Sequence, residues 1–307
     1  MARVGVALAL VALIASIVWL LAPRGGIPAV VAPGVQAQLV AKAFNFLEGP
    51  VGTEDGGLYF TDLPANKIYR LDPDGLISVA REKSGQANGL AVTRDALLAA
   101  EMTDRRISKW SRTAAVTTIS DHIGANRYMA PNDLIADAQG GIYFTDPGNF
   151  DEPAPHTAFV YYLPPGPEEP VVVDDQIRRP NGIALTPDGK TLIVSDTTGG
   201  AVFAYDLQPD GTAKNKRIFA NLRDIPAGKD SVADGMAVDR DGRLYVTTRT
   251  SVQVFDAKGD HLGTIEVPRM PANVAFSGAD KRALYITARD GLYRVEMLAQ
   301  GPDRLGK

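Results

Sequence analysis

The chain has 307 residues, with 45% hydrophobic and 22% charged side chains, a net charge of −4 and no cysteine. This composition is typical of a globular protein. The lack of cysteine excludes disulfides, Cys-ligated zinc and a cysteine nucleophile, and the lack of a long basic run argues against nucleic-acid binding.

The first expected element is a targeting segment. Arg3 precedes an apolar run over residues 4–22, and about 20 apolar residues suffice to span a hydrocarbon core. Residues 1–22 are therefore expected to be a signal peptide, with a candidate cleavage site at Val35-Gln36-Ala37, or an uncleaved membrane anchor. Either alternative places the body of the protein outside the cytoplasm, in the periplasm, secreted, or tethered to the membrane through residues 4–22.

After the targeting segment we expect a linker over residues 23–37, a folded domain over 38–298 and a tail over 299–307. Within the domain one pattern recurs at an interval of about 40 to 50 residues, which is the length of one propeller blade. Each copy opens on a polar residue and closes on a β-rich run, such as Leu58-Tyr-Phe-Thr-Asp62. The openings are Glu48, Asn88, Asn132, Asn181, Asp234 and a sixth at either Ala272 or Asn273.

Asp-Gly and Gly-Gly pairs between the apolar runs indicate hairpins, and no long stretch has helical periodicity. We therefore predict an all-β fold, a six-bladed β-propeller with four-stranded blades. The strand-like segment Gln38–Phe44 precedes the first copy. We expect it to join the last blade and close the ring, which removes exposed sheet edges.

The opening residues form the candidate site. Because the first strand of each blade lines the central channel, residues at one repeat position should lie at one height around it. Asn and Asp before Gly are also ordinary turn residues, which is the alternative interpretation. Turn chemistry does not favour Glu48, however, and does not explain the same offset in every blade. Two carboxylates in a narrow channel repel one another unless a cation lies between them.

The expected ligands are all oxygens, which favours Ca²⁺ first, with Mg²⁺ or Mn²⁺ next and Zn²⁺ as a weaker alternative. Asn273 is left out of the set because its register is ambiguous by one residue. Four oxygens leave coordination positions for water or substrate, since Ca²⁺ accepts about 6 to 8 ligands. We therefore predict an open divalent-metal site.

Other polar features have structural interpretations. The pairs Thr61-Asp62, Thr145-Asp146 and Ser195-Asp196 are expected to cap turns, and Arg105-Arg106 to lie in a solvated turn. The sequence has three histidines, His122, His156 and His261. His156 lies in a long insertion over residues 147–157, and we expect it to be a surface residue; the alternative is that the insertion overhangs the channel mouth. A serine-hydrolase elbow, a phosphate-binding loop and a dinucleotide fingerprint are all missing from the sequence.

The motifs also carry a resemblance. Glu48-Gly-Pro, Ala87-Asn88-Gly-Leu, Pro131-Asn132-Asp-Leu, Pro180-Asn181-Gly and Ala233-Asp234-Gly-Met are similar, in this order, to motifs of the senescence-marker-protein/gluconolactonase family. The resemblance implies a metal held by Glu48, Asn181 and Asp234, with Asn132 as a fourth ligand or substrate contact. It implies that Asp234 transfers the proton and that Asn88 lines the pocket.

The resemblance further implies hydrolysis of sugar lactones or similar cyclic esters and, in some relatives, of organophosphates. Two departures border the expected pocket. Ala100-Glu101-Met102 stands where the family often has Cys-Glu-His, and Gly148-Asn149-Phe150 where it usually has Pro-Tyr-Gly. A different class of function is also open, a non-catalytic extracytoplasmic binding propeller in which Ca²⁺ only makes the channel rigid.

Overall fold

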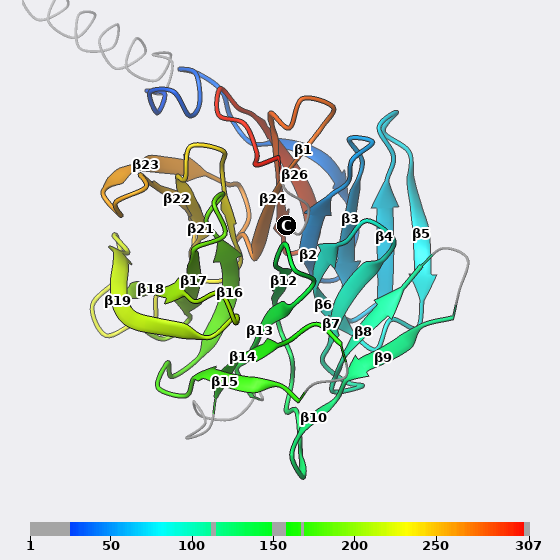
Figure 1. Cartoon of the computed structure of the whole chain (residues 1–307). Coiled ribbons are helices and arrows are strands. Elements are labelled where there is room, and N and C mark those ends of the chain that lie inside the picture. Colours follow the sequence, from blue (N-terminus) through cyan, green and yellow to red (C-terminus); the bar gives the residue numbers. More distant parts are fainter. Residues whose placement is uncertain (1–24, 112–114, 149–157, 167–168, 304–307) are drawn as a thin grey trace, which may run out of the picture.

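The structure is a computed structural model that describes residues 25–111, 115–148, 158–166 and 169–303. Within these residues it contains strands and no helix. Six sheets of four antiparallel strands are arranged in a circle around a central axis, and one edge strand of each sheet is innermost (Figure 1). The prediction of a six-bladed propeller with four-stranded blades is therefore confirmed.

The first three blades follow one another along the chain. Blade 1 contains β2 (Leu47–Gly52), β3 (Leu58–Asp62), β4 (Lys67–Leu71) and β5 (Ile77–Glu82). Blade 2 contains β6 (Ala87–Val92), β7 (Leu97–Glu101), β8 (Arg106–Trp110) and β9 (Thr117–Ser120). A small hairpin of β10 (His122–Ile123) and β11 (Asn126–Arg127) precedes blade 3, which contains β12 (Leu134–Ala136), β13 (Ile142–Asp146), β14 (Phe159–Leu163) and β15 (Val171–Asp174).

The last three blades complete the circle. Blade 4 contains β16 (Pro180–Leu185), β17 (Thr191–Asp196), β18 (Ala201–Leu207) and β19 (Ala213–Asn221). Blade 5 contains β20 (Met236–Val238), β21 (Leu244–Thr247), β22 (Ser251–Phe255) and β23 (His261–Glu266). Blade 6 takes β24 (Asn273–Ser277), β25 (Ala283–Ala288) and β26 (Gly291–Glu296) from the C-terminal end and β1 (Gln38–Lys42) from the start of the domain.

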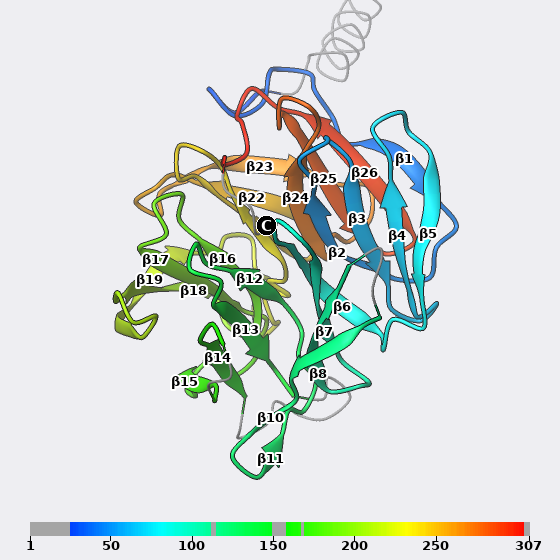
Figure 2. The ribbon, with the colours of Figure 1, turned by 45° about the vertical axis from the view of Figure 1, so that its right-hand side comes forward.

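The pairing of β1 with β26 confirms that the first strand closes the ring. Figure 2 shows β1 beside β26, although the two strands come from opposite ends of the domain sequence. A closed circle needs no exposed edge at the junction of its first and last blades, because strands from both ends of the domain share one sheet.

The core is divided into six apolar clusters, one between each pair of neighbouring blades. Leu47 and Phe60 of blade 1, for example, pack against Ala275 and Leu292 of blade 6. The strands near the centre are thus covered on both faces. All five residues of β3, the second strand of blade 1, are buried. Double-sided burial is the reason for the continuous apolar runs in the sequence, where a half-exposed strand would alternate.

A glycine follows four of the opening residues, Glu48, Asn88, Asn181 and Asp234, and close approach between blades explains it. Gly182 lies inside β16 and not in a turn. A Cβ atom on it would stand 2.2 Å from the Asp234 carbonyl oxygen of blade 5. At Gly49, inside β2, a Cβ would stand 1.9 Å from the Asn88 carbonyl oxygen of blade 2. The alternative interpretation of Asn181-Gly182 as a turn is therefore wrong, since these glycines let neighbouring inner strands touch.

We expect Gly182→Ala to destabilise the protein by about 1–3 kcal/mol, because the contacted atoms are backbone and the inner strands of blades 4 and 5 would have to separate. Gly200→Ala is the matched control in blade 4, since its Cβ would meet only the Ile225 side chain, at 3.3 Å. Urea unfolding of the two variants measures the difference. Equal midpoints would contradict the assignment of Gly182 to interblade packing.

The described N-terminal residues pack on the propeller. Val30, in the segment expected as a linker, accepts hydrogen bonds from the Leu298 and Ala299 N–H groups at 2.8 and 3.2 Å, and its side chain is buried among residues of blades 5 and 6. Leu298 follows the end of β26, and β26 runs in the same direction as β24, the inner strand of blade 6. The contact with Val30 therefore lies on the face of the propeller where the inner strands end. No membrane-spanning helix occurs in residues 25–111, 115–148, 158–166 or 169–303, and the apolar run 4–22 lies outside them.

Candidate metal centre and active site

Strand register places six residues at one equivalent position at the start of the inner strands. Glu48 lies across from Thr61 of the second strand. In blades 3, 5 and 6 the equivalent residue is identified by its N–H group, which donates to the carbonyl of the corresponding threonine. The pairs are Asn132 with Thr145, Asp234 with Thr247 and Ala272 with Thr287. We call the six positions the ring. In order around the channel they are Glu48, Asn88, Asn132, Asn181, Asp234 and Ala272.

Hydroxyl groups of the second strands link the ring positions of neighbouring blades. Thr61 Oγ1 donates to the Asn88 carbonyl at 3.0 Å, Thr145 Oγ1 to that of Asn181 at 2.7 Å, and Ser195 Oγ to that of Asp234 at 2.9 Å. Thr247 Oγ1 makes the same bond to the Ala272 carbonyl, at 2.8 Å. The sixth ring residue is therefore Ala272 and not Asn273, whose Oδ1 instead accepts the N–H of Val274.

The structure thus brings all five predicted site residues together and gives the sixth blade no ligand oxygen. The carboxylates of Glu48 and Asp234 flank Ala272, and the three amides occupy the other side of the ring. Glu48 is 3% exposed, and its Oε2 accepts the Gly49 N–H at 3.1 Å. Asp234 is half-buried and is fixed through its backbone, with its N–H donating to the Thr247 carbonyl at 3.1 Å.

Asn181 has the clearest sign of a missing ligand. Its Nδ2 donates to Thr197 Oγ1 at 3.0 Å, which orients the amide. Its Oδ1 is buried and has no hydrogen-bond partner in the described residues. Because a buried acceptor without a partner is costly, the arrangement fits a cation at Oδ1. Thr197 is a site residue that the sequence analysis missed, since its offset from Asn181 has meaning only in the folded blade.

Asn88 repeats this arrangement with a weaker anchor. Its Nδ2 faces Met102 Sδ at 3.5 Å, and its Oδ1 is buried without a partner in the described part of the chain. Asn132 is buried, and its backbone joins the blades by accepting the Gly89 N–H at 2.7 Å. Two carboxylates and oriented amide oxygens are the donors that hard divalent cations prefer. Among the described residues no three His, Cys, Asp or Glu side chains gather at one point, so any metal here depends on the amides.

The acidic residues at the ends of the second strands are turn caps, as predicted. Asp146 accepts the Met129 and Ala130 N–H groups at 2.7 and 2.8 Å and so holds the connection that leads to Asn132. Burial raises the pKa of Asp146 above its ordinary value, against the lowering effect of these N–H groups. The sequence analysis missed the second function of this motif, the interblade hydrogen bond of Thr145.

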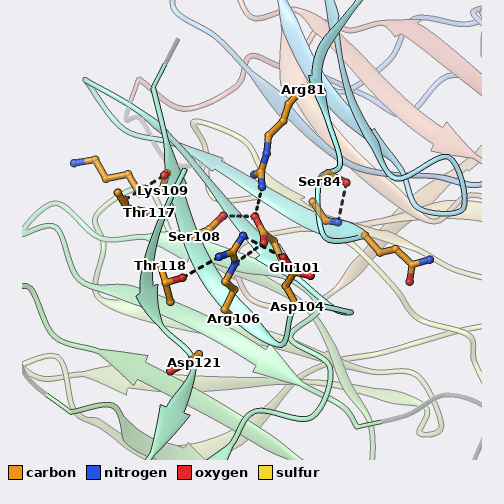
Figure 3. A network of polar contacts seen from close by, with 12 residues as sticks. Arg81, Ser84, Glu101, Asp104, Arg106, Ser108, Lys109, Thr117, Thr118 and Asp121 are labelled. Carbon is orange, nitrogen blue, oxygen red and sulfur yellow. Dashed lines mark hydrogen bonds and ion pairs between the residues drawn. The ribbon is translucent and has the colours of Figure 1, made fainter. Parts of the chain in front are cut away.

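Blade 2 replaces the capping aspartate with Glu101, which is fully buried. Figure 3 shows its carboxylate between two arginines and a serine, with Arg81 Nη2 at 2.7 Å, Arg106 Nε at 2.6 Å and Ser108 Oγ at 2.5 Å. The prediction of a solvated turn at Arg105-Arg106 is therefore wrong for Arg106. Arg105 donates to the Tyr128 carbonyl at 2.5 Å.

A second circle of residues lies above the ring, one at the end of each second strand. Met102 and Thr197 define it, because each contacts the ring amide of its own blade. We call it the upper tier, and its members by the same register are Leu63, Met102, Pro147, Thr197, Arg249 and Arg289.

A pocket of about 460 Å³ opens on the same face, over blade 5. It contains none of the ring residues but is bordered by Arg249 of the upper tier and by Thr248 and Ser231. In the described residues no histidine belongs to the ring or lines the pocket. His122 is exposed beside Asp121, His261 lies in β23, and His156 is outside the described residues.

Comparisons with known proteins agree with this geometry. Residues 46–290 match the family model described as the SMP-30/gluconolactonase/LRE-like region. The chain is 28% identical to the gluconolactonase of Zymomonas mobilis over 84% of this chain and 80% of that protein. It is 26% identical to a pentonolactonase of Haloferax volcanii, over 80% and 81%. A solved gluconolactonase from Xanthomonas campestris superposes with a TM-score of 0.77 at 29% identity, covering 91% of this chain and 92% of that one.

Proposed function

Because the chain belongs to the SMP-30/gluconolactonase/LRE-like family, we propose that it is a divalent-metal-dependent hydrolase of a sugar lactone or similar cyclic ester. The buried, unpartnered Oδ1 of Asn181, in the blade next to that of Asp234, carries the metal part of the proposal. Lactonase relatives that differ in sugar, the gluconolactonase and the pentonolactonase, support the substrate class.

Glu48, Asn132, Asn181 and Asp234 would hold the cation, and Ca²⁺ is the best match for four oxygen donors in a ring of this kind. When bound, the cation would supply Lewis-acid polarisation of the lactone carbonyl. Thr197 accepts a hydrogen bond from Nδ2 of Asn181, which fixes the amide and would leave Oδ1 free to bind the cation. Asn88, with a free acceptor oxygen, would accept a hydrogen bond from a substrate hydroxyl.

Asp234 is the proposed proton-transfer residue. Its carboxylate accepts a proton from the attacking water as the new C–O bond forms at the carbonyl carbon. The same proton then goes to the leaving alkoxide as the ring C–O bond breaks. The product is a single hydroxy acid, so no leaving group has to diffuse away between the steps.

The test is a panel of sugar lactones assayed with and without a chelator. We expect hydrolysis that is lost on chelation and restored by Ca²⁺, together with a higher melting temperature when Ca²⁺ is bound. A melting shift without turnover of any lactone would instead favour the non-catalytic binding propeller. Turnover of phosphotriesters in preference to lactones would favour the organophosphate hydrolase.

We propose further that the protein acts outside the cytoplasm. The apolar run 4–22 supports this proposal. Val30, near the start of the described residues, contacts the propeller on the face opposite the ring. A membrane tether through residues 4–22 would therefore leave the ring facing away from the membrane. Mass spectrometry of the native N-terminus distinguishes a cleaved signal from an anchor, and a cytoplasmic location of the intact chain would contradict the proposal.

A further inference from the structure

The upper tier has two chemically different halves. Blades 1 to 3 contribute apolar side chains, and blades 4 to 6 contribute Thr197, Arg249 and Arg289. The arginines follow directly on the strand ends of blades 5 and 6, each as the first residue of a two-residue turn. Thr248 N–H donates to the Ser251 carbonyl around one turn, and Ala288 pairs with Gly291 around the other. The backbone of each arginine therefore lies at the ring end of its own blade, in the blades of Asp234 and Ala272.

Neither arginine has a carboxylate partner in the described structure. Arg289 places its guanidinium 4.8 Å from the centre of the Phe46 ring, with Nη2 3.4 Å from Met270 Sδ. Arg249 Nη2 donates to the backbone carbonyl of Asp230 at 3.2 Å. The nearest acid along the chain, Asp290, is paired instead with Arg269 at 3.1 Å. A thioether and an aromatic face position a guanidinium without neutralising it.

Arg289 also occupies an unfavourable backbone conformation, with φ of +53°. Glycine or asparagine would adopt this conformation at lower cost. Local turn chemistry therefore does not account for arginine at this position. A residue held in the left-handed region beside a candidate site suggests a functional requirement for its side chain.

An anionic group over Glu48 or Asp234 would meet a carboxylate, whereas Ala272, between these two ring positions, offers only a methyl group. Arg289 lies at the end of the second strand of the same blade as Ala272. Arg249 also borders the 460 Å³ pocket, so there is space beside it for a substituent. Asp224 and Glu266 also line that pocket, and their negative charge would weaken the attraction of an anion to Arg249. Arg289 is therefore expected to contribute more to anion binding than Arg249.

We propose that the preferred substrate is a lactone with an anionic group, such as a carboxylate, away from the lactone ring, and that Arg289 with Arg249 binds that group. Guanidinium groups bind carboxylate and phosphate in this way through paired N–H donors. The inference rests on the proposed lactonase function and specifies its substrate class.

The experiment compares D-glucono-1,4-lactone with D-glucaro-1,4-lactone, which differ in having a hydroxymethyl group or a carboxylate at C6. Wild-type protein with Ca²⁺ should have a kcat/KM ratio that favours the charged lactone. In Arg289→Gln the ratio should fall at least about tenfold, with the larger change in KM, because a hydrogen bond to a charged group is lost. Arg249→Gln should lower it less, and the double variant most.

Arg94→Gln is the matched control, since it removes the same charge from an exposed turn on the opposite face and should leave the ratio unchanged. A second measurement avoids variants. Glucarate should inhibit hydrolysis of the neutral lactone at least about tenfold more strongly than gluconate does. Hydrolysis of both lactones with no preference, or a preference that survives in the double variant, would overturn this inference alone. Hydrolysis of neither would overturn the lactonase assignment, and this inference with it.

Discussion

Asp234→Asn is expected to lower kcat for lactone hydrolysis by about 10²–10⁴-fold, the usual contribution of a general base. The amide keeps the size of the side chain and one metal-binding oxygen but cannot accept the proton of the attacking water. The fold should survive, because Asp234 is tied to its neighbours by backbone atoms. Its carbonyl accepts from Ser195 Oγ at 2.9 Å, and its N–H donates to the Thr247 carbonyl at 3.1 Å.

The measurement is single-substrate kinetics beside a thermal unfolding curve in chelator. Asp230→Asn is the matched control, an exposed carboxylate in the same connection between blades 4 and 5. It should retain activity on a neutral lactone. A kcat for Asp234→Asn within a few fold of the wild type would remove Asp234 from the proton-transfer role and leave it as a ligand only.

Glu101→Gln should reduce the free energy of unfolding by about 3 kcal/mol or more, because breaking a buried ion pair leaves an uncompensated charge. Glu101 is fully buried and Arg81 is 8% exposed, so water cannot replace the lost partner. The bond from Arg81 joins β5 of blade 1 to β7 of blade 2. The substitution therefore acts on an interface between blades as well as on one turn.

Urea unfolding measures this effect, with Glu82→Gln as the control. Glu82 is the next residue after Arg81, and its side chain is 65% exposed in a pair with Lys67. Loss of an exposed pair has little effect on stability. Equal unfolding midpoints for the two variants would show that the Glu101 network does not hold blades 1 and 2 together. A secondary loss of activity in Glu101→Gln is also expected, because Met102 follows it and contacts Asn88.

The repeat in the sequence was sufficient to predict the fold and five ring residues. A propeller places residues of one repeat position at one height, so Glu48, Asn88, Asn132, Asn181 and Asp234 could be grouped from their offsets alone. The closing strand could also be predicted, because a strand-like segment, Gln38–Phe44, precedes the first copy of the repeat. In the structure Gln38–Lys42 completes the sheet of blade 6.

What depends on contacts between blades was decided only by the tertiary structure. Ala272 and Asn273 differ by one residue, and the bond from Thr247 Oγ1 to the Ala272 carbonyl selects between them. The glycine after Asn181 looks like a turn residue in sequence, but the atom that excludes a side chain there belongs to Asp234 of the next blade. Arg81 of blade 1 and Glu101 of blade 2 meet only across the interface between the two blades. The period of a sequence determines which residues are equivalent, whereas the partner of each residue depends on packing that the period does not contain.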